Sequence, residues 1–165
     1  MGKLEDKYVL EVWDSFLPDD MWEHLLEFND IIPWQDRDGG FLYSDTTGYE
    51  FFNTYCVNRI NERHEDNHKI HRSYRNGMTT HTEAANHYDM HNIADRTAIF
   101  YGHPEWDTEQ WGGETTVGEP IHTWIKAVPN RLVLLSAKHN RHYGYAPQPT
   151  CDTLRITYVW KLITI

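Results

Sequence analysis

The chain contains few cysteines, fewer basic than acidic residues, and no long apolar run. Its two cysteines, Cys56 and Cys151, share no close spacing, so we expect free thiols rather than a disulfide. Lys and Arg number 15 against 25 Asp and Glu, and the formal charge of −10 argues against nucleic acid or an anionic membrane as partner. No apolar segment approaches about 18 residues, and the N-terminus lacks a secretory-signal pattern. These absences favour a soluble cytoplasmic protein.

The chain does contain a sizeable fraction of apolar residues and many histidines. Hydrophobic residues make up 39% of the 165 residues and aromatic residues 14%, which suffices for a packed core and excludes wholesale disorder. A chain of this length usually buries one core, so we expect a single domain over 1–165. Of the 11 histidines, all but His24 lie between His64 and His142, and this surplus indicates metal binding, proton chemistry or both.

The first part of the chain, residues 1–66, has the pattern of a helical front. A short strand is predicted over 9–12. Pro18 and the two aspartates after it fit the first turn of a helix, whose apolar residues then recur at helical spacing. A second helix is predicted over 49–63. Segment 30–47 is rich in Asp, Gly and Pro, and we interpret it as a long loop that could act as a lid.

From residue 67 onward, short β-prone runs alternate with glycine, proline and asparagine. Many short strands behind a pair of helices are typical of an antiparallel sandwich or barrel with helices packed on one face. The expected fold class is therefore α+β, mainly β, with the β core over 67–165. The predicted strands cover 69–74, 97–101, 115–117, 123–127, 131–135 and 154–165.

Three spacings among the histidines could supply metal ligands. His87 and Asp89 form an H-x-D, and on a strand residues i and i+2 point to the same face. One further histidine would complete a 2-His-1-carboxylate set, which leaves coordination positions open in non-haem Fe(II) oxygenases. His81 with Glu83 offers the same pattern. His91, four residues after His87, gives the spacing of two zinc ligands on a helix, but the glutamate of a zinc-protease helix is missing.

Two longer stretches carry an ordered series of motifs. The first is HYDMHNIADRTAIFYGHPEWDTEQWGGETTV, with an H-x-D, an Arg, a strand ending in Tyr, an Asp- and Trp-rich turn, and W-G-G-E-T. The second is PNRLVLLSAKHNRHYGYAPQPTCDTLRITYVWKL, with a distal His and a later L-R-I-T. Together they resemble the prolyl-4-hydroxylase-like Fe(II)/2-oxoglutarate-dependent dioxygenase family, over roughly residues 69–163. The resemblance implies a double-stranded β-helix, or jelly roll, with the N-terminal helices packed on one sheet.

The resemblance implies that Fe(II) is held by His87, Asp89 and a distal histidine. For that last ligand, His142 fits the family better than His139, because a glycine-containing step and then an Arg follow it. The number of residues between Asp89 and the Tyr101 that ends the next strand also matches the family, which favours His87 and Asp89 over His81 and Glu83. The upstream H-x-E then becomes a candidate for the approach to the pocket.

Arg155 is the candidate for binding 2-oxoglutarate. A guanidinium at the base of an apolar barrel can grip a carboxylate with two parallel N–H bonds, a geometry that Lys cannot reproduce. Thr157 shares the strand face of Arg155 and could line the same pocket. The resemblance adds Tyr101, whose hydroxyl would meet the same carboxylate. Further residues expected around the site or its pocket are Glu114, Trp160, Arg72 and Tyr74.

Four other positions bear on the comparison with the family. The paired glycines of W-G-G-E-T, Gly112 and Gly113, would let the backbone turn tightly beside the site. Asn130 stands where the family usually has Gly, and asparagine can replace glycine in a left-handed conformation. Leu135 stands where Phe is usual. These departures bear on the substrate pocket rather than on the metal ligands.

For activity, the resemblance implies hydroxylation of an unactivated C–H bond, most directly prolyl 4-hydroxylation of a peptide or protein. Fe(II), O₂ and 2-oxoglutarate would be required, succinate and CO₂ would be released, and ascorbate would support turnover. Hydroxylation of a free amino acid or another small molecule is an alternative on the same fold. A metal-binding jelly roll without catalysis is the alternative from another class. We expect a monomer or a weak homodimer.

Overall fold

The computed structural model describes residues 9–64, 67–82, 84–85, 87–89, 95–118 and 122–165. Within them, antiparallel strands form a seven-stranded major sheet and a three-stranded minor sheet. The major sheet has the order β1 (Leu10–Trp13), β8 (Leu132–Ser136), β5 (Arg96–Tyr101), β10 (Arg155–Thr164), β4 (His68–Met78), β3 (Phe41–Asp45) and β2 (Gln35–Arg37). The minor sheet has the order β7 (Thr123–Ile125), β6 (Thr115–Val117) and β9 (His142–Gly144).

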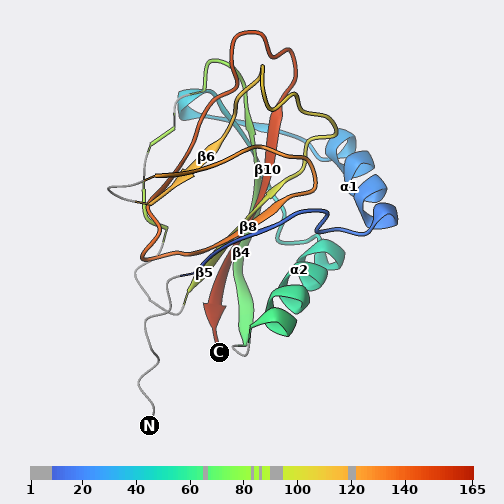
Figure 1. Cartoon of the computed structure of the whole chain (residues 1–165). Coiled ribbons are helices and arrows are strands. Elements are labelled where there is room, and N and C mark those ends of the chain that lie inside the picture. Colours follow the sequence, from blue (N-terminus) through green and yellow to red (C-terminus); the bar gives the residue numbers. More distant parts are fainter. Residues whose placement is uncertain (1–8, 65–66, 83, 86, 90–94, 119–121) are drawn as a thin grey trace.

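The molecule has three layers. In Figure 1 the helices α1 (Asp19–Ile31) and α2 (Glu50–Arg63) lie on one side of the long strands of the major sheet, and β6 of the minor sheet lies on the other. Two facing antiparallel sheets with helices packed against one of them are the jelly-roll architecture that the sequence predicted. The candidate site lies between the two sheets.

Alternation along the strands divides the interior into two hydrophobic cores. In β5, Ala98 and Phe100 face the helices, whereas Ile99 and Tyr101 face the minor sheet. The six residues of β5 are all buried because this strand is covered on both faces. Residues two apart on a strand share a face, so β5 and β8 contribute to both cores at once.

The helices begin and end where the local sequence indicates. Pro18 directly precedes α1, where the missing proline N–H costs no helical hydrogen bond. Two aspartates occupy the first turn of this helix. The buried residues of α2 recur every three or four positions and face the major sheet. One of them, Asn53, accepts a hydrogen bond from the indole N–H of Trp160 at 2.7 Å, which ties α2 to β10.

Segment 30–47 is not the loop that the sequence predicted. Helix α1 continues to Ile31, and β2 and β3 then form a hairpin around one short turn, Asp38–Gly40. Two consecutive glycines in this turn have positive φ, 77° and 75°, which favours glycine. Because β3 also pairs with β4, the segment is a paired edge of the major sheet rather than a free lid.

Backbone features expected from the family pattern are present. Gly112 and Gly113 have φ of 63° and 76°, and Asn130 has φ of 59°. The Asn130 side chain also accepts a hydrogen bond from the Leu17 N–H at 2.8 Å and donates one to the Leu17 carbonyl at 2.9 Å. A glycine at this position could not make these two bonds, so asparagine adds a link between the turn and the start of α1.

Both cysteines are buried free thiols, as expected. In the described part of the chain, no helix combines the length and the apolar character needed to cross a bilayer.

Candidate metal centre and its pocket

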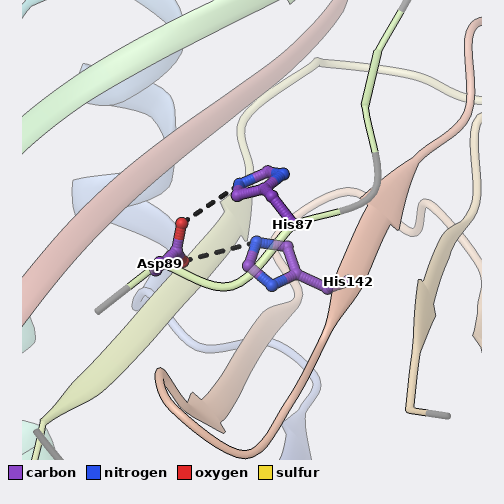
Figure 2. A group of neighbouring side chains, drawn as sticks. All are labelled: His87, Asp89 and His142. Atoms are coloured by element: carbon purple, nitrogen blue, oxygen red, sulfur yellow. Dashed lines mark hydrogen bonds and ion pairs between the residues drawn. The ribbon is translucent and has the colours of Figure 1, made fainter. Parts of the chain in front are cut away.

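Two imidazoles and one carboxylate converge on a single point between the sheets. The side chains of His87, Asp89 and His142 each offer one ligand atom, and these atoms lie within 4.8 Å of one another. His87 Nε2 is 3.1 Å from Asp89 Oδ1, and His142 Nε2 is 3.3 Å from Asp89 Oδ2 (Figure 2). The carboxylate is 4% exposed and His142 is 7% exposed, whereas His87 is 54% exposed and forms the open side of the group.

Backbone pairing positions the two histidines. His87 and His142 form an isolated antiparallel bridge, in which each N–H donates to the other's carbonyl at 3.1 and 3.0 Å. The Asp89 N–H donates to the carbonyl of Ala137 at 3.3 Å, which anchors the third ligand to the end of β8. Ligand-bearing segments far apart in the sequence are therefore joined through their main chains.

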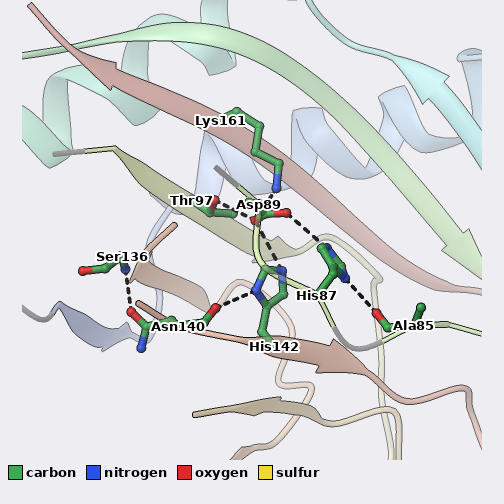
Figure 3. A network of polar contacts seen from close by, with 8 residues as sticks. All are labelled: Ala85, His87, Asp89, Thr97, Ser136, Asn140, His142 and Lys161. Carbon is green, nitrogen blue, oxygen red and sulfur yellow. Dashed lines mark hydrogen bonds and ion pairs between the residues drawn. The ribbon is translucent and has the colours of Figure 1, made fainter. Parts of the chain in front are cut away.

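The imidazoles are oriented by their second ring nitrogens. Nδ1 of His87 lies 2.7 Å from the Ala85 carbonyl, and Nδ1 of His142 lies 3.1 Å from the Asn140 carbonyl (Figure 3). A carbonyl only accepts, so Nδ1 carries the proton in both rings. Nε2 of His87 donates to the Asp89 carboxylate when this ring is protonated, and in the neutral form each Nε2 has a lone pair for a metal ion. Metal-binding histidines are commonly held in this way.

Two further side chains contact the carboxylate, and the sequence reasoning missed both. Thr97 of β5 donates its hydroxyl hydrogen bond to Asp89 Oδ2 at 2.8 Å, and Lys161 of β10 forms an ion pair with the same oxygen (Figure 3). Burial acts to raise the pKa of Asp89, but the hydrogen bond from His87 and the positive charge of Lys161 outweigh it. The pKa of Asp89 consequently lies well below its usual range, and the group is a carboxylate.

The donor set fits a divalent transition metal. Two imidazole nitrogens and one carboxylate oxygen on one side of a point form the facial set typical of non-haem Fe(II), and the remaining positions are free for other ligands. Burial lowers the pKa of His142, which favours the neutral, metal-binding form of this ring. A site of two nitrogens and one oxygen is unlike the all-oxygen sites that Mg²⁺ and Ca²⁺ prefer.

A cavity of about 370 Å³, here called the central pocket, extends from these ligands along the inner face of the major sheet. His87 and His142 line one part of it, and Arg155 lines another. Between them the walls are mainly uncharged, with Met78, Ile99 and Val159 among the lining side chains. The pocket thus joins a metal-binding group, beside which Lys161 also lines it, to the buried cation Arg155 through mainly uncharged walls.

Arg155 is buried at 2% exposure and is held by neutral acceptors. Its Nε donates to the Gly113 carbonyl at 2.6 Å, and its Nη2 donates to Thr115 Oγ1 at 3.1 Å. The Tyr101 hydroxyl donates to the same Thr115 oxygen at 2.7 Å. Among the described residues no carboxylate forms an ion pair with Arg155, and Nη1 faces only the weakly accepting Met78 sulfur at 3.2 Å. A buried guanidinium without a counter-ion is suited to binding an anionic ligand.

Most of the other predicted residues lie near this pocket. Thr157 and Tyr74 line it, and Tyr101 reaches it through the oxygen that it shares with Arg155. The Glu114 carboxylate lies close enough for its charge to act on Arg155. Arg72 lines a smaller recess that adjoins the central pocket.

The prediction for Trp160 is wrong. It belongs to the core between the major sheet and the helices, where its indole contacts Asn53. The reason is strand alternation: Arg155, Thr157 and Lys161 of β10 face the pocket, so Trp160 faces away.

The competing ligands do not join the group. His81 is exposed and His139 lies in the turn before β9, and neither belongs to the three-residue cluster. Glu83 and His91, the remaining candidates, lie outside the described residues.

Searches by sequence find no matching family model and no matching curated protein. Comparison of the fold finds similar solved structures. A prolyl hydroxylase from Trichoplax adhaerens, in complex with a hypoxia-inducible-factor peptide, is 14% identical with a TM-score of 0.70, covering 92% of this chain and 82% of that one. A viral collagen prolyl hydroxylase from Paramecium bursaria Chlorella virus-1 is 18% identical with a TM-score of 0.65, covering 100% and 95%.

A third structure, an oxidoreductase of the 2OG-Fe(II) oxygenase family from Burkholderia pseudomallei, is 10% identical with a TM-score of 0.71 and covers 96% of this chain and 86% of that one. These likenesses extend over nearly the whole chain, so the protein has the jelly-roll fold of prolyl hydroxylases and 2-oxoglutarate/Fe(II) oxygenases.

Proposed function

We propose that the protein is an Fe(II)- and 2-oxoglutarate-dependent dioxygenase that hydroxylates an unactivated C–H bond. The observation that carries the proposal is the pairing, within one pocket, of a 2-His-1-carboxylate group with a buried arginine that forms no ion pair with any residue the structure describes. The first group is suited to Fe(II), and the second to the distal carboxylate of a keto acid. The likeness in fold to 2-oxoglutarate oxygenases supports the same conclusion.

The metal would be held by Nε2 of His87, Nε2 of His142 and a carboxylate oxygen of Asp89. When bound, Fe(II) would supply the oxidative chemistry, in which O₂, 2-oxoglutarate and R–H yield R–OH, succinate and CO₂. Thr97 donates to the carboxylate and would fix its orientation, whereas the ammonium of Lys161 pairs with the same oxygen and would compete with the metal for it.

Arg155 would bind the distal carboxylate of 2-oxoglutarate. Its Nε and part of its Nη2 are already occupied by Gly113 and Thr115, so the guanidinium cannot turn away from the pocket. The donors available to an anion are the second N–H of Nη2 and those of Nη1, whose contact is with the weakly accepting Met78 sulfur. The apolar side chains between Arg155 and the metal ligands would exclude water around the carbon chain.

For the substrate, a prolyl residue of a peptide is the first candidate, with product 4-hydroxyproline. Two of the similar structures are named prolyl hydroxylases, and one of them is a peptide complex. Phe41 and Tyr74 give the pocket an apolar and aromatic lining that suits a pyrrolidine ring.

The test separates metal binding from co-substrate binding. Titration of the protein with Mn(II), followed by 2-oxoglutarate, should show both ligands binding, and Fe(II) with O₂ should give 2-oxoglutarate-dependent succinate release. Asp89→Ala should lose metal binding. Arg155→Lys keeps the charge but loses the forked geometry, so we expect Mn(II) affinity to be retained and 2-oxoglutarate affinity to fall about tenfold or more.

Arg59→Gln is the matched control, because Arg59 lies on the exposed surface of α2 and pairs with Glu62. It should leave both affinities unchanged. An iron-loaded wild-type protein that binds no 2-oxoglutarate and releases no succinate with any peptide or amino acid would refute the proposal.

A further inference from the structure

The inner face of the major sheet has a positive charge at each end of the central pocket. Along β10 the pocket-facing residues are Arg155, Thr157, Val159 and Lys161. The two cations are six residues apart, which corresponds to about 20 Å along a strand. Arg155 faces the proposed co-substrate end, and Lys161 lies beside the metal ligand Asp89. The second positive end therefore lies beside the metal ligands, six residues along β10 from Arg155.

A second cation stands directly beside Lys161. Arg72 of β4 is its cross-strand partner, and such partners point to the same face with Cβ atoms about 5 Å apart. Arg72 lines a recess of about 240 Å³ together with Arg37 of β2. This recess shares Phe41, Tyr74 and Asn76 with the central pocket, so the two hollows adjoin each other. We call it the arginine recess.

Aromatic rings hold the two arginines in place. The guanidinium carbon of Arg37 lies 3.5 Å from the centre of the Tyr43 ring, and that of Arg72 lies 5.7 Å from the same ring and 4.8 Å from Tyr74. The rings of Tyr43 and Tyr74 are stacked at 5.7 Å. Arg72 Nη2 also donates to the Tyr43 hydroxyl at 3.0 Å. Stacking leaves the N–H edges of a guanidinium available for hydrogen bonds.

The charge of these arginines is not neutralised by an ion pair. Within the described residues, neither Arg37 nor Arg72 has a carboxylate oxygen within salt-bridge distance. Asp45 is close enough for its charge to raise the pKa of Arg72, but its Oδ1 accepts the Thr47 N–H at 2.8 Å. Asp38 also lines the recess, but it forms no ion pair with either arginine within the described residues. In a chain with 25 acidic and 15 basic residues, two stacked and unpaired arginines beside a reaction site are well suited to an anion.

We propose that the arginine recess binds a carboxylate of the substrate while the reacting carbon lies at the metal. The inference rests on the proposed function and narrows its substrate class to molecules with a carboxylate near the hydroxylated position. Two sources share this chemistry: a Glu or Asp side chain next to the target residue in a peptide, and the carboxylate of a free amino acid. Arg155 would then serve the co-substrate, and Arg37 and Arg72 the substrate.

The test measures binding without turnover. A fluorescein-labelled peptide with glutamate on both sides of a proline is titrated with Mn(II)- and 2-oxoglutarate-loaded protein without O₂, and its glutamine counterpart is titrated in parallel. We expect the glutamate peptide to bind at least about tenfold more tightly, with an advantage that shrinks as salt increases. The double variant Arg37→Gln/Arg72→Gln should lose this advantage, whereas Arg59→Gln should keep it.

Two further arms complete the test. Arg72→Glu should reverse the preference toward a lysine peptide, which a general loss of structure would not do. If free L-glutamate displaces the labelled peptide at a similar concentration, the carboxylate bound by the recess is that of a small molecule. If only unlabelled peptide displaces it, the carboxylate belongs to a protein substrate. Equal affinity for the glutamate and glutamine peptides, with no displacement by free glutamate, would overturn the inference. Failure of the wild type to bind 2-oxoglutarate would refute the proposed function instead. The affinities of the glutamate and glutamine peptides can then still be compared in metal-free protein.

Discussion

Replacing His103 with glutamine should flatten the pH dependence of folding stability in weakly acidic solution. The imidazole is fully buried next to Trp106, with ring centres 4.4 Å apart, and its Nε2 lies 3.2 Å from the Ala127 carbonyl. Burial is the main cause that lowers the pKa of His103 to about 4, and the nearby charge of Arg155 adds to it. The folded protein therefore keeps this group neutral at a pH where the unfolded chain protonates it.

The magnitude follows from the two pKa values. The unfolded value is 6.5 and the folded value about 4, so the unfolded state binds more protons between these limits. Stability from this group is complete above pH 6.5 and is lost as the pH falls toward 4. Linkage gives a loss of about 2 kcal/mol between pH 7.5 and pH 5, and about 3 kcal/mol once both states are protonated.

The measurement is the free energy of unfolding in urea at pH 7.5 and pH 5, with EDTA present. His103→Gln keeps a donor for the Ala127 carbonyl but does not titrate, so its free energy should fall about 2 kcal/mol less than that of the wild type over this interval. His122→Gln, at an exposed position, should follow the wild-type slope. Parallel profiles for the wild type and His103→Gln would refute the reasoning.

Two other substitutions test the surroundings of the site. In Gly113→Ala the new methyl group would lie 3.0 Å from the Trp106 ring and 3.1 Å from Arg155 Cδ at a φ of 76°, so we expect urea unfolding to show a loss of about 2 kcal/mol. Gly48→Ala, where nothing lies within 4 Å, should lose less than about 1 kcal/mol, and an equal loss in both would contradict the argument. Lys161→Met removes the ammonium that pairs with the metal-binding carboxylate, so we expect Mn(II) affinity to rise about tenfold in competition with a chromogenic chelator; unchanged or weaker binding would show that the ammonium does not compete with the metal.

Local patterns predicted the elements that are buried and regular. Helices α1 and α2 lie close to the predicted ranges because their buried residues repeat at helical spacing. Strands β5, β6 and β8 coincide with β-prone runs because every residue in them is buried. Burial in such segments requires apolar residues, so the sequence pattern indicates where these helices and strands lie.

The sequence did not predict strands β2 and β9. Both are formed by backbone pairing with neighbouring strands and have no characteristic side-chain pattern. All three residues of β2 are exposed, so no apolar alternation marks this edge strand. Strand β9 has three residues, one of them glycine, and exists because its backbone pairs with β6. Both depend on contacts with distant parts of the chain, which local propensity does not encode.

The candidate site was only partly accessible from the sequence. The i, i+2 spacing suggested that His87 lies beside Asp89, but it suggested the same for His81 and Glu83. The choice of His87 and Asp89, like that of His142, came from the order and spacing of the family motifs. Strand alternation, applied to Arg155 and Thr157, would also have reached Lys161 and would have excluded Trp160. Thr97 could not have been found in this way, because its contact with the carboxylate depends on how β5 lies against the ligand segment.

The backbone bridge between His87 and His142 bears on how the protein acquires its metal. Because the main chains already hold these two ligands together, binding an ion requires little ordering of the chain, and the protein should fold equally well before it meets one. Such a ready-made site ranks divalent ions largely by their intrinsic affinity for nitrogen and oxygen donors, an order in which Fe(II) stands below Cu(II) and Zn(II). Which ion fills the protein would then depend on the supply of metals around it, and adding zinc should displace iron without disturbing the fold.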